Sequence, residues 1–121
     1  MHRFSHIEIS TTDLARSREF YQRLFDWQVE ETMDTYWMMR TPREPDAGLS
    51  LVQEVPRVGP TIAFVTVGSL DETLQRAVEL GAVVAQPRTE IAGGFGAYAH
   101  LQEPGGAIIG VYQGPEPSAG D

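Results

Sequence analysis

Cysteine is missing from this chain of 121 residues, and basic residues are few. Without thiols, the chain can form no disulfides, no thiolate metal sites and no cysteine nucleophile. Lys and Arg number 9 against 17 Asp and Glu, so the formal net charge is −8 and the pI is about 4.7. Because nucleic acids and anionic membrane surfaces are bound through basic side chains, this balance argues against both as partners.

Long hydrophobic runs are missing too. No apolar segment approaches the ~20 residues that a membrane-spanning helix needs. The opening Met1-His2-Arg3-Phe4 leads directly into a predicted strand and shows no apolar segment of a signal peptide. The cytoplasm is therefore the expected location.

The remaining composition is that of an ordinary globular protein, with 41% hydrophobic and 21% charged residues. The length suits one core and is too short for two independent ones, so a single domain is predicted over residues 1–113. Residues 114–121 are rich in Gly, Pro and acidic side chains and are predicted to be a disordered tail.

The first half of the chain changes its hydrophobic period from two to that of a helix. Polar and apolar residues alternate over residues 4–10, which is typical of a strand with one core face and one wetter face. Thr11-Thr12-Asp13 then supplies a helix N-cap, followed by apolar residues at helical spacing. Three further strands are predicted at residues 27–33, 36–41 and 48–54.

The second half repeats this order. A strand at residues 61–67 precedes the capping box Ser69-Leu70-Asp71-Glu72, and Gly81 ends the helix that the box starts. Strands follow at about residues 82–90, 96–103 and 107–113. The predicted fold class is therefore α+β, with two βαβββ repeats covering about residues 4–54 and 61–113.

The repeats can be aligned residue by residue. His6-Ile7-Glu8-Ile9 aligns with Thr61-Ile62-Ala63-Phe64, and Leu49-Ser50-Leu51 aligns with Ile109-Gly110-Val111. Each helix is expected to cover the face that carries Ile7 and Ile9, or Ile62 and Phe64. Paired curved mixed sheets with the helices on their outer faces would then enclose a cleft, which is the usual place for a ligand.

Two segments of the sequence resemble motifs of a known family. Residues 13–21, Asp-Leu-Ala-Arg-Ser-Arg-Glu-Phe-Tyr, are similar to its "D-L-x-x-S-x-x-F-Y" helix, and residues 103–110 are similar to its "D-P-x-G-N-x-x-E" turn and strand. The family is the vicinal oxygen chelate superfamily, which holds glyoxalase I, bleomycin-resistance proteins, fosfomycin-resistance enzymes and extradiol dioxygenases. The resemblance spans residues 4–113. Within the superfamily, the sequence most resembles uncharacterised proteins related to lactoylglutathione lyase.

The resemblance implies a metal site that this sequence does not complete. Metal-using members hold a divalent ion with one residue from each of four strands, usually His or Glu. In the alignment above, His6, Ser50, Thr61 and Gly110 take these positions, and His6 is the one good ligand among them. No metal ligand set and no cofactor are predicted, although a metal in a displaced site stays open.

The candidate site residues are polar or aromatic side chains expected on the cleft face. His6, Glu8 and His100 are candidates for acid–base catalysis, because imidazole titrates near neutral pH. The alternative is that they are ordinary polar residues of half-solvated strands, and that the aromatic residues only pack. The predicted binding residues are His6, Glu8, Tyr36, Met38, Ser50, Thr61, Tyr98, His100, Gly110 and Tyr112.

Three functions fit these features. The first is a glyoxalase/bleomycin-resistance-like protein that binds a small organic molecule in a metal-independent cleft. The second is a lyase, isomerase or transferase of the same superfamily that uses His6, Glu8 and His100, or a displaced metal; whether the chain is an enzyme is left open. The third is a regulatory or interaction module. The resemblance also implies a homodimer.

Overall fold

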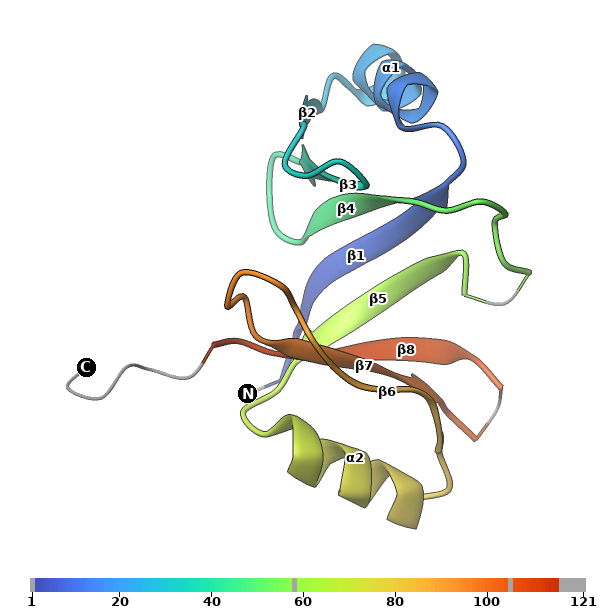
Figure 1. Cartoon of the computed structure of the whole chain (residues 1–121), viewed down its shortest axis with the longest axis vertical. Helices are drawn as coiled ribbons and strands as arrows, with labels where there is room; N and C mark the ends of the chain where they lie inside the picture. The colour runs from blue at the N-terminus through green and yellow to red at the C-terminus, as the bar shows by residue number, and fades with distance from the viewer. Residues whose placement is uncertain (1, 58, 105, 116–121) are drawn as a thin grey trace, which may run out of the picture. The chain divides into compact units, whose positions relative to one another are not determined.

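The computed structural model describes residues 2–57, 59–104 and 106–115. These described residues form eight strands and two helices, labelled in Figure 1 where there is room. Contacts divide the chain into two units. The N-terminal unit is residues 4–63, and the C-terminal unit is residues 64–121 together with residues 1–3. The elements are β1 (Phe4–Thr11), α1 (Leu14–Phe25), β2 (Gln28–Glu30), β3 (Tyr36–Arg40), β4 (Asp46–Leu51), β5 (Thr61–Thr66), α2 (Leu70–Glu79), β6 (Val83–Glu90), β7 (Ala97–Gln102) and β8 (Ile108–Gln113).

In the N-terminal unit the strands follow the order β2-β3-β4-β1, and the first residues of β5 come next to β1. Strands β1 and β4 run parallel, whereas β3 is antiparallel to both β2 and β4. The backbone N–H of Ser10 donates to the carbonyl oxygen of Pro60 at 2.9 Å. The core lies between α1 and one face of these strands and is formed by Leu14, Met39, Ala47 and Leu49, with Ile7, Ile9, Tyr21, Trp27, Val29 and Trp37 packed around them.

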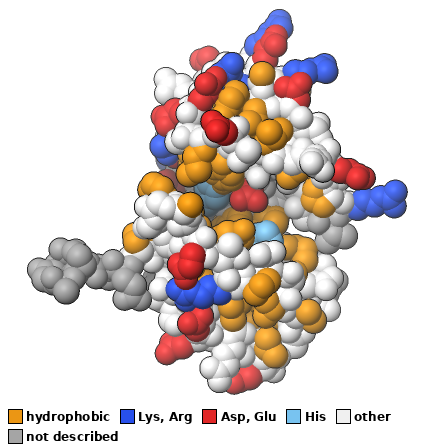
Figure 2. Space-filling model, viewed as in Figure 1, with side chains coloured by type: hydrophobic (Ala, Val, Ile, Leu, Met, Phe, Trp, Pro, Cys, Tyr) orange, Lys and Arg blue, Asp and Glu red, His pale blue; other side chains and the backbone are white. Residues whose placement is uncertain are grey.

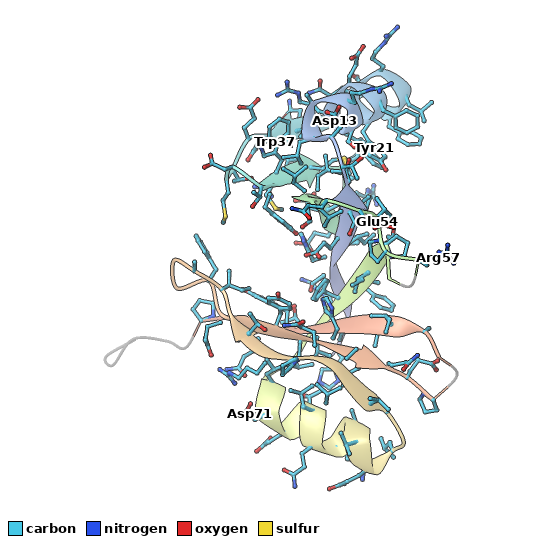
Figure 3. All side chains as sticks on the ribbon, turned by 45° about the vertical axis from the view of Figure 1, so that its right-hand side comes forward. Asp13, Tyr21, Trp37, Glu54, Arg57 and Asp71 are labelled. Carbon is cyan, nitrogen blue, oxygen red and sulfur yellow. The ribbon has the colours of Figure 1, made fainter. Side chains whose placement is uncertain are left out.

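Helix α1 begins at the predicted N-cap and is capped at its other end by Asp26. The Asp13 side chain accepts a hydrogen bond from the backbone N–H of Arg16 at 3.0 Å, which satisfies one of the unpaired donors of the first turn. Asp26 ends the helix in the left-handed conformation, with φ of 61°. Tyr21, on α1, stacks on Trp27 at 5.9 Å. Tyr21 and Trp37, both labelled in Figure 3, pack around the same core, so aromatic packing holds the helix.

In the C-terminal unit the strands follow the order β5-β8-β7-β6. Strands β5 and β8 run parallel, and the other two pairs are antiparallel. Helix α2 covers one face of these strands (Figure 1). The core between them contains Val67, Leu70, Ala97, Ala99, Leu101 and Val111, with Val65, Leu74, Ala77, Val84 and Ile109 packed against it.

Helix α2 begins at the predicted capping box, and a hydrogen bond from a distant strand also holds its first turn. Ser69 accepts from the backbone N–H of Glu72 at 3.2 Å, as the capping box predicts. The backbone N–H of Leu70 donates to the side chain of Gln113, at the end of β8, at 2.7 Å. Gly81 follows the helix with φ of +101°, so it adopts the backbone conformation that stops a helix.

The predicted fold class is confirmed: the protein is α+β, with an eight-stranded mixed sheet in the order β2-β3-β4-β1-β5-β8-β7-β6 and two helices. The second strand is shorter than predicted, Gln28–Glu30 in place of residues 27–33. Of the predicted disordered tail, residues 116–121 lie outside the described residues. Within the described ranges, no helix is long and apolar enough to cross a membrane.

One face assignment was wrong. Ile62 and Phe64 were expected beneath the second helix, but Val65 and Val67 belong to that core. Phe64 packs on the opposite face, against Tyr98 and His100. The physical reason is that β5 is apolar on both faces, so alternation alone does not say which face the helix covers.

Candidate functional site

His6, Glu8 and Tyr36 form what we call the polar face of the N-terminal unit. Ile7 and Ile9 pack into the core beneath α1, so alternation along β1 directs His6 and Glu8 to the other side of the sheet. Trp37 and Met39 also belong to that core, which directs Tyr36 to the same side as His6. The three predicted site residues are thus brought together.

Because Gly48 has no side chain, the Tyr36 ring can lie directly over the strand at this residue. In the sheet, Gly48 is in register with Glu8 on β1 and with Met38 on β3. A Cβ atom at residue 48 would lie 1.8 Å from the Tyr36 hydroxyl oxygen and 2.1 Å from Cζ, so no side chain fits beneath the ring. The prediction from sequence missed Gly48, although a glycine inside a strand is a known sign of such a close approach.

Tyr36 links the other two members of the polar face. Its hydroxyl lies 2.5 Å from Nε2 of His6, and it also shares a hydrogen bond with the Glu8 carboxyl. Burial lowers the pKa of His6, and the charge of Asp46 partly offsets this. Burial raises the pKa of Glu8, and the hydrogen bond from Tyr36 opposes the rise. Burial and the neighbouring Glu8 together raise the pKa of Tyr36, which keeps its proton.

Asp46 and Arg40 form an ion pair beside the polar face. Asp46 is in register with His6, and its carboxylate accepts from Arg40 at 2.9 Å and from the backbone N–H of Thr41 at 3.2 Å. Burial opposes ionisation of Asp46, but these donors outweigh it and lower the pKa of the carboxyl. Arg40 also contacts Glu30 at 3.5 Å, so its charge is already matched by two carboxylates.

The corresponding face of the C-terminal unit is aromatic. The ring of Phe64 lies over Gly110, where a Cβ atom would approach it to 2.4 Å. Phe64 contacts Tyr98 and His100 edge-on, with ring centroids 6.3 and 5.6 Å apart. Burial lowers the pKa of His100. Among the described residues, Nε2 of His100 is buried without a hydrogen-bond partner, so the neutral imidazole is favoured.

The register of the two units corrects the alignment of the repeats. Glu8 pairs with Gly48 and lies five residues before the N-cap Asp13, and Phe64 pairs with Gly110 and lies five residues before the N-cap Ser69. The structurally equivalent positions are therefore His6 and Ile62, Glu8 and Phe64, Tyr36 and Tyr98, Met38 and His100, Gly48 and Gly110, and Ser50 and Tyr112. The alignment from sequence was shifted by one residue on β5 and by two on β4.

The remaining predicted site residues have less distinctive surroundings. Met38 is half-buried and its backbone N–H donates to the Thr32 hydroxyl at 3.0 Å. Ser50 is half-buried opposite Tyr36, and Thr61 is exposed at the start of β5.

The Tyr112 side chain is hydrogen-bonded to the turn at residues 93–96. Its hydroxyl donates to the carbonyl oxygen of Phe95 at 2.5 Å, within the glycine-rich turn at residues 93–96. The backbone N–H of Ile91 also donates to the carbonyl oxygen of Gly96 at 2.9 Å. Both hydrogen bonds therefore hold the turn.

The donor set of these positions does not fit a divalent metal ion. With the corrected register, the positions that the family resemblance assigns to ligands hold one imidazole, two glycines and an isoleucine: His6, Gly48, Gly110 and Ile62. Rings also occupy the space above both glycines. Across the described ranges there is no group of three or more His, Cys, Asp or Glu residues that could hold a metal.

Each unit thus has the order β-strand, helix and three further strands. Several solved structures have a similar α+β fold. A hypothetical protein from Bacillus halodurans C-125 matches with a TM-score of 0.73 at 16% identity, covering 98% of each chain. Methylmalonyl-CoA epimerase from Mycobacterium tuberculosis matches at 0.66 and 16% identity, covering 94% of this chain and 88% of the other. Homoprotocatechuate 2,3-dioxygenase from Arthrobacter globiformis matches at 0.66 and 25% identity, covering 94% of this chain and 36% of that one.

The family assignment comes from sequence. Residues 3–111 match the model of the Glyoxalase/Bleomycin resistance protein/Dioxygenase superfamily, and the chain belongs to this family. The resemblance drawn from the helix and turn phrases is therefore confirmed. No curated protein matches the chain.

Proposed function

We propose that this protein binds a small organic molecule at the polar face of the N-terminal unit, and that it does so without a metal ion. The observation that carries the proposal is the hydrogen-bonded group of His6, Tyr36 and Glu8. Titratable groups with shifted pKa values are held together at cost to the fold, and such groups concentrate at functional sites.

A thermal-shift screen of small organic compounds tests binding. A compound that binds should raise the melting temperature of the wild type by several degrees. It should raise that of Tyr36→Phe by less, because this variant lacks the hydroxyl that connects His6 with Glu8. Glu54→Gln is the matched control, since Glu54 lies on the segment between β4 and β5 (Figure 3) and is exposed. A hit that stabilises both variants equally would move the binding site away from the polar face.

Elemental analysis and EDTA test independence from metal. Freshly purified protein should contain no stoichiometric divalent metal, and EDTA should leave the melting temperature unchanged, because the donor set offers one imidazole. The same result is expected after incubation with Ni²⁺, Zn²⁺, Mn²⁺ or Fe²⁺. An equimolar ion that is lost in His6→Ala would contradict the proposal.

A second candidate is acid–base catalysis, for which the N-terminal unit offers His6 and Glu8. The observation in its favour is that Tyr36 connects His6 with Glu8, so a proton taken up at one group can be balanced at the other. Exchange of carbon-bound hydrogen for deuterium in enolisable carbonyl compounds, followed by NMR in D₂O, would detect such chemistry. Catalysed exchange that Glu8→Gln removes would favour an enzyme over a binding protein.

We also propose that the protein is a cytoplasmic homodimer. Apolar side chains are exposed in both units, and Figure 2 shows them interspersed with charged groups. Burial of such side chains is what drives self-association. Sedimentation equilibrium should give twice the chain mass of 13.4 kDa, and a monomer across the micromolar range would contradict the proposal.

A further inference from the structure

Glu8 is a half-buried carboxyl without a positive partner. Among the residues that the structure describes, no arginine or histidine nitrogen lies within ion-pair distance of it, and its hydrogen-bond partner is the neutral Tyr36 hydroxyl. A desolvated carboxylate with one neutral donor is incompletely compensated, because ionised groups away from water need charge partners or several donors.

The neighbouring charges do not supply that partner. The charged and titratable groups beside Glu8 are His6 on β1, Tyr36 on β3, and the Asp46–Arg40 pair that joins β4 to β3. Arg40 is held by Asp46 and Glu30. Burial lowers the pKa of His6 against the charge of Asp46, which favours the neutral imidazole. Counted over the described residues of the N-terminal unit, the polar face therefore presents one carboxyl group in excess of its cations.

The hydrogen bonds of Tyr36 allow the group two proton arrangements. When Glu8 is ionised, Tyr36 donates its single proton to the carboxylate, and Nε2 of His6 donates to the Tyr36 oxygen. When Glu8 is protonated, it donates to Tyr36, which donates to Nε2 of the other His6 tautomer. The three residues carry a net charge of minus one in the first arrangement and zero in the second, and are positive in neither.

We propose that Glu8, Tyr36 and His6 act as one proton-sharing group that recognises the protonated amine of a small organic ligand, with Gly48 holding Tyr36 in position. The inference rests on the proposed function and names the class of ligand. Binding is balanced as follows: protonated Glu8 and an ammonium ion give a carboxylate–ammonium pair, and the carboxyl proton leaves to solvent. Where Glu8 is already ionised, no proton is released.

The sign of the pH dependence follows from this balance. A bound ammonium stabilises the ionised form of Glu8 and so lowers its pKa, and affinity must rise with pH until Glu8 is ionised in the unbound protein. Burial raises the pKa of Glu8, so this titration is shifted toward higher pH. Above it, affinity should be constant until the ligand amine itself loses its proton.

Calorimetry with benzylamine, which is protonated at neutral pH, tests the ligand class. Wild-type protein should bind benzylammonium about tenfold or more tightly than benzyl alcohol, since a hydrogen-bonded charge pair replaces a neutral contact. Glu8→Gln should lose that preference, and Glu54→Gln, with the same change in net charge, should keep it. At pH values where Glu8 is partly protonated, titrations in two buffers of different protonation enthalpy should show proton release.

The outcomes separate this inference from the proposed function. Equal affinity for the amine and the alcohol, or an undiminished amine preference in Glu8→Gln, would overturn the recognition of a cation. If benzylammonium does not bind but uncharged compounds from the thermal-shift screen do, the inference fails and the proposed function stands. If no compound binds, both fail.

A pair of glycine variants tests the positioning role. Gly48→Ala should weaken benzylammonium binding about as much as Tyr36→Phe, roughly tenfold, because the new Cβ displaces the Tyr36 hydroxyl from Glu8 and His6. Gly68→Ala is the control, since a Cβ there would meet no atom within 4 Å. Circular dichroism checks that each variant is folded. An NMR titration of the Glu8 carboxyl adds a ligand-independent readout: its pKa should rise in both Tyr36→Phe and Gly48→Ala, and an unchanged value in folded Tyr36→Phe would overturn the shared-proton arrangement.

Discussion

At the scale of single residues, the two units share a strand glycine beneath an aromatic ring and differ in which ring lies over it. Gly48 and Gly110 occupy equivalent strand positions, and each lies beneath an aromatic ring. Tyr36 brings a hydroxyl into contact with His6 in one unit, whereas Phe64 brings none into the other. The same backbone arrangement therefore supports a polar group in one unit and an apolar cluster in the other.

Gly110→Ala should destabilise the protein. The new Cβ would lie 2.4 Å from the Phe64 ring, and inserting a methyl group into a packed contact costs about 1–3 kcal/mol. Urea denaturation measures the change in the free energy of unfolding. Gly68→Ala, which meets no neighbour, provides the comparison, and equal stability of the two variants would show that the Phe64 ring is not packed as described.

His100→Phe should make the protein less sensitive to acid. Burial lowers the pKa of His100 in the folded state, so below pH ~6.5 the unfolded chain binds a proton that the folded protein does not. That difference destabilises the wild type as pH falls toward about 5, and Phe removes it while keeping a ring against Phe64 and Tyr98. Between about pH 7.5 and 5, the variant should lose less unfolding free energy than wild type, as measured by urea denaturation at each pH.

The control for that experiment is His2→Gln, because His2 is exposed near the N-terminus. His2→Gln should follow the wild-type pH dependence. If His100→Phe also follows it, the buried imidazole nitrogen is compensated in the folded protein, and its lack of a partner has no energetic consequence.

At the scale of secondary-structure elements, each helix depends on a cap and on one apolar stripe. Ser69 and Asp13 both accept a backbone N–H in the first turn. Beneath the helices, Leu49 and Leu70 are fully buried in separate clusters, one in each unit. The stability of each element therefore depends on local capping and on packing against its own strands.

Ser69→Ala should lower the free energy of unfolding by about 1 kcal/mol, because the N–H of Glu72 loses its acceptor. Ser69→Asp should restore most of the loss, since Asp caps as well as Ser and adds a favourable charge at the helix N-terminus. Thermal and urea denaturation measure both. Equal stability of Ser69→Ala and wild type would show that water replaces the cap.

Leu49→Ala should cost about 2–5 kcal/mol, through lost burial and the cavity left behind. Leu80→Ala is the matched control, because Leu80 is 63% exposed and its loss should change stability by no more than about 0.5 kcal/mol. A small effect at residue 49 would mean that the strands around it close the cavity.

At the scale of the whole molecule, the net charge of −8 is the dominant long-range term. Like charges repel in the compact state and are screened by salt, with a Debye length of about 10 Å at 0.1 M. The melting temperature should therefore rise by a few degrees between about 0.01 and 0.3 M NaCl. A fall over that range would show that the ion pairs, such as Arg40–Asp46, outweigh the repulsion.

Much of this protein could be predicted from the sequence because the relevant signals are local. Alternation in residues 4–10, the caps at Asp13 and Ser69 and the stop at Gly81 gave the order of elements and the α+β class. The equivalence of Tyr36 and Tyr98 in the sheet is also visible locally, because each lies six residues before a proline, Pro42 or Pro104.

What the tertiary structure decided is register and contact. The helix-facing side of β5 could not be read from a strand that is apolar on both faces, and the roles of Gly48 and Phe64 appear only when strands distant in sequence are paired. The sequence does not show why residues 48 and 110 are glycines. The reason is that an aromatic ring occupies the space that a side chain would need at each position. The sequence alone therefore determined the elements, the charge and the family likeness, while the fold brought His6, Tyr36 and Glu8 into one hydrogen-bonded group.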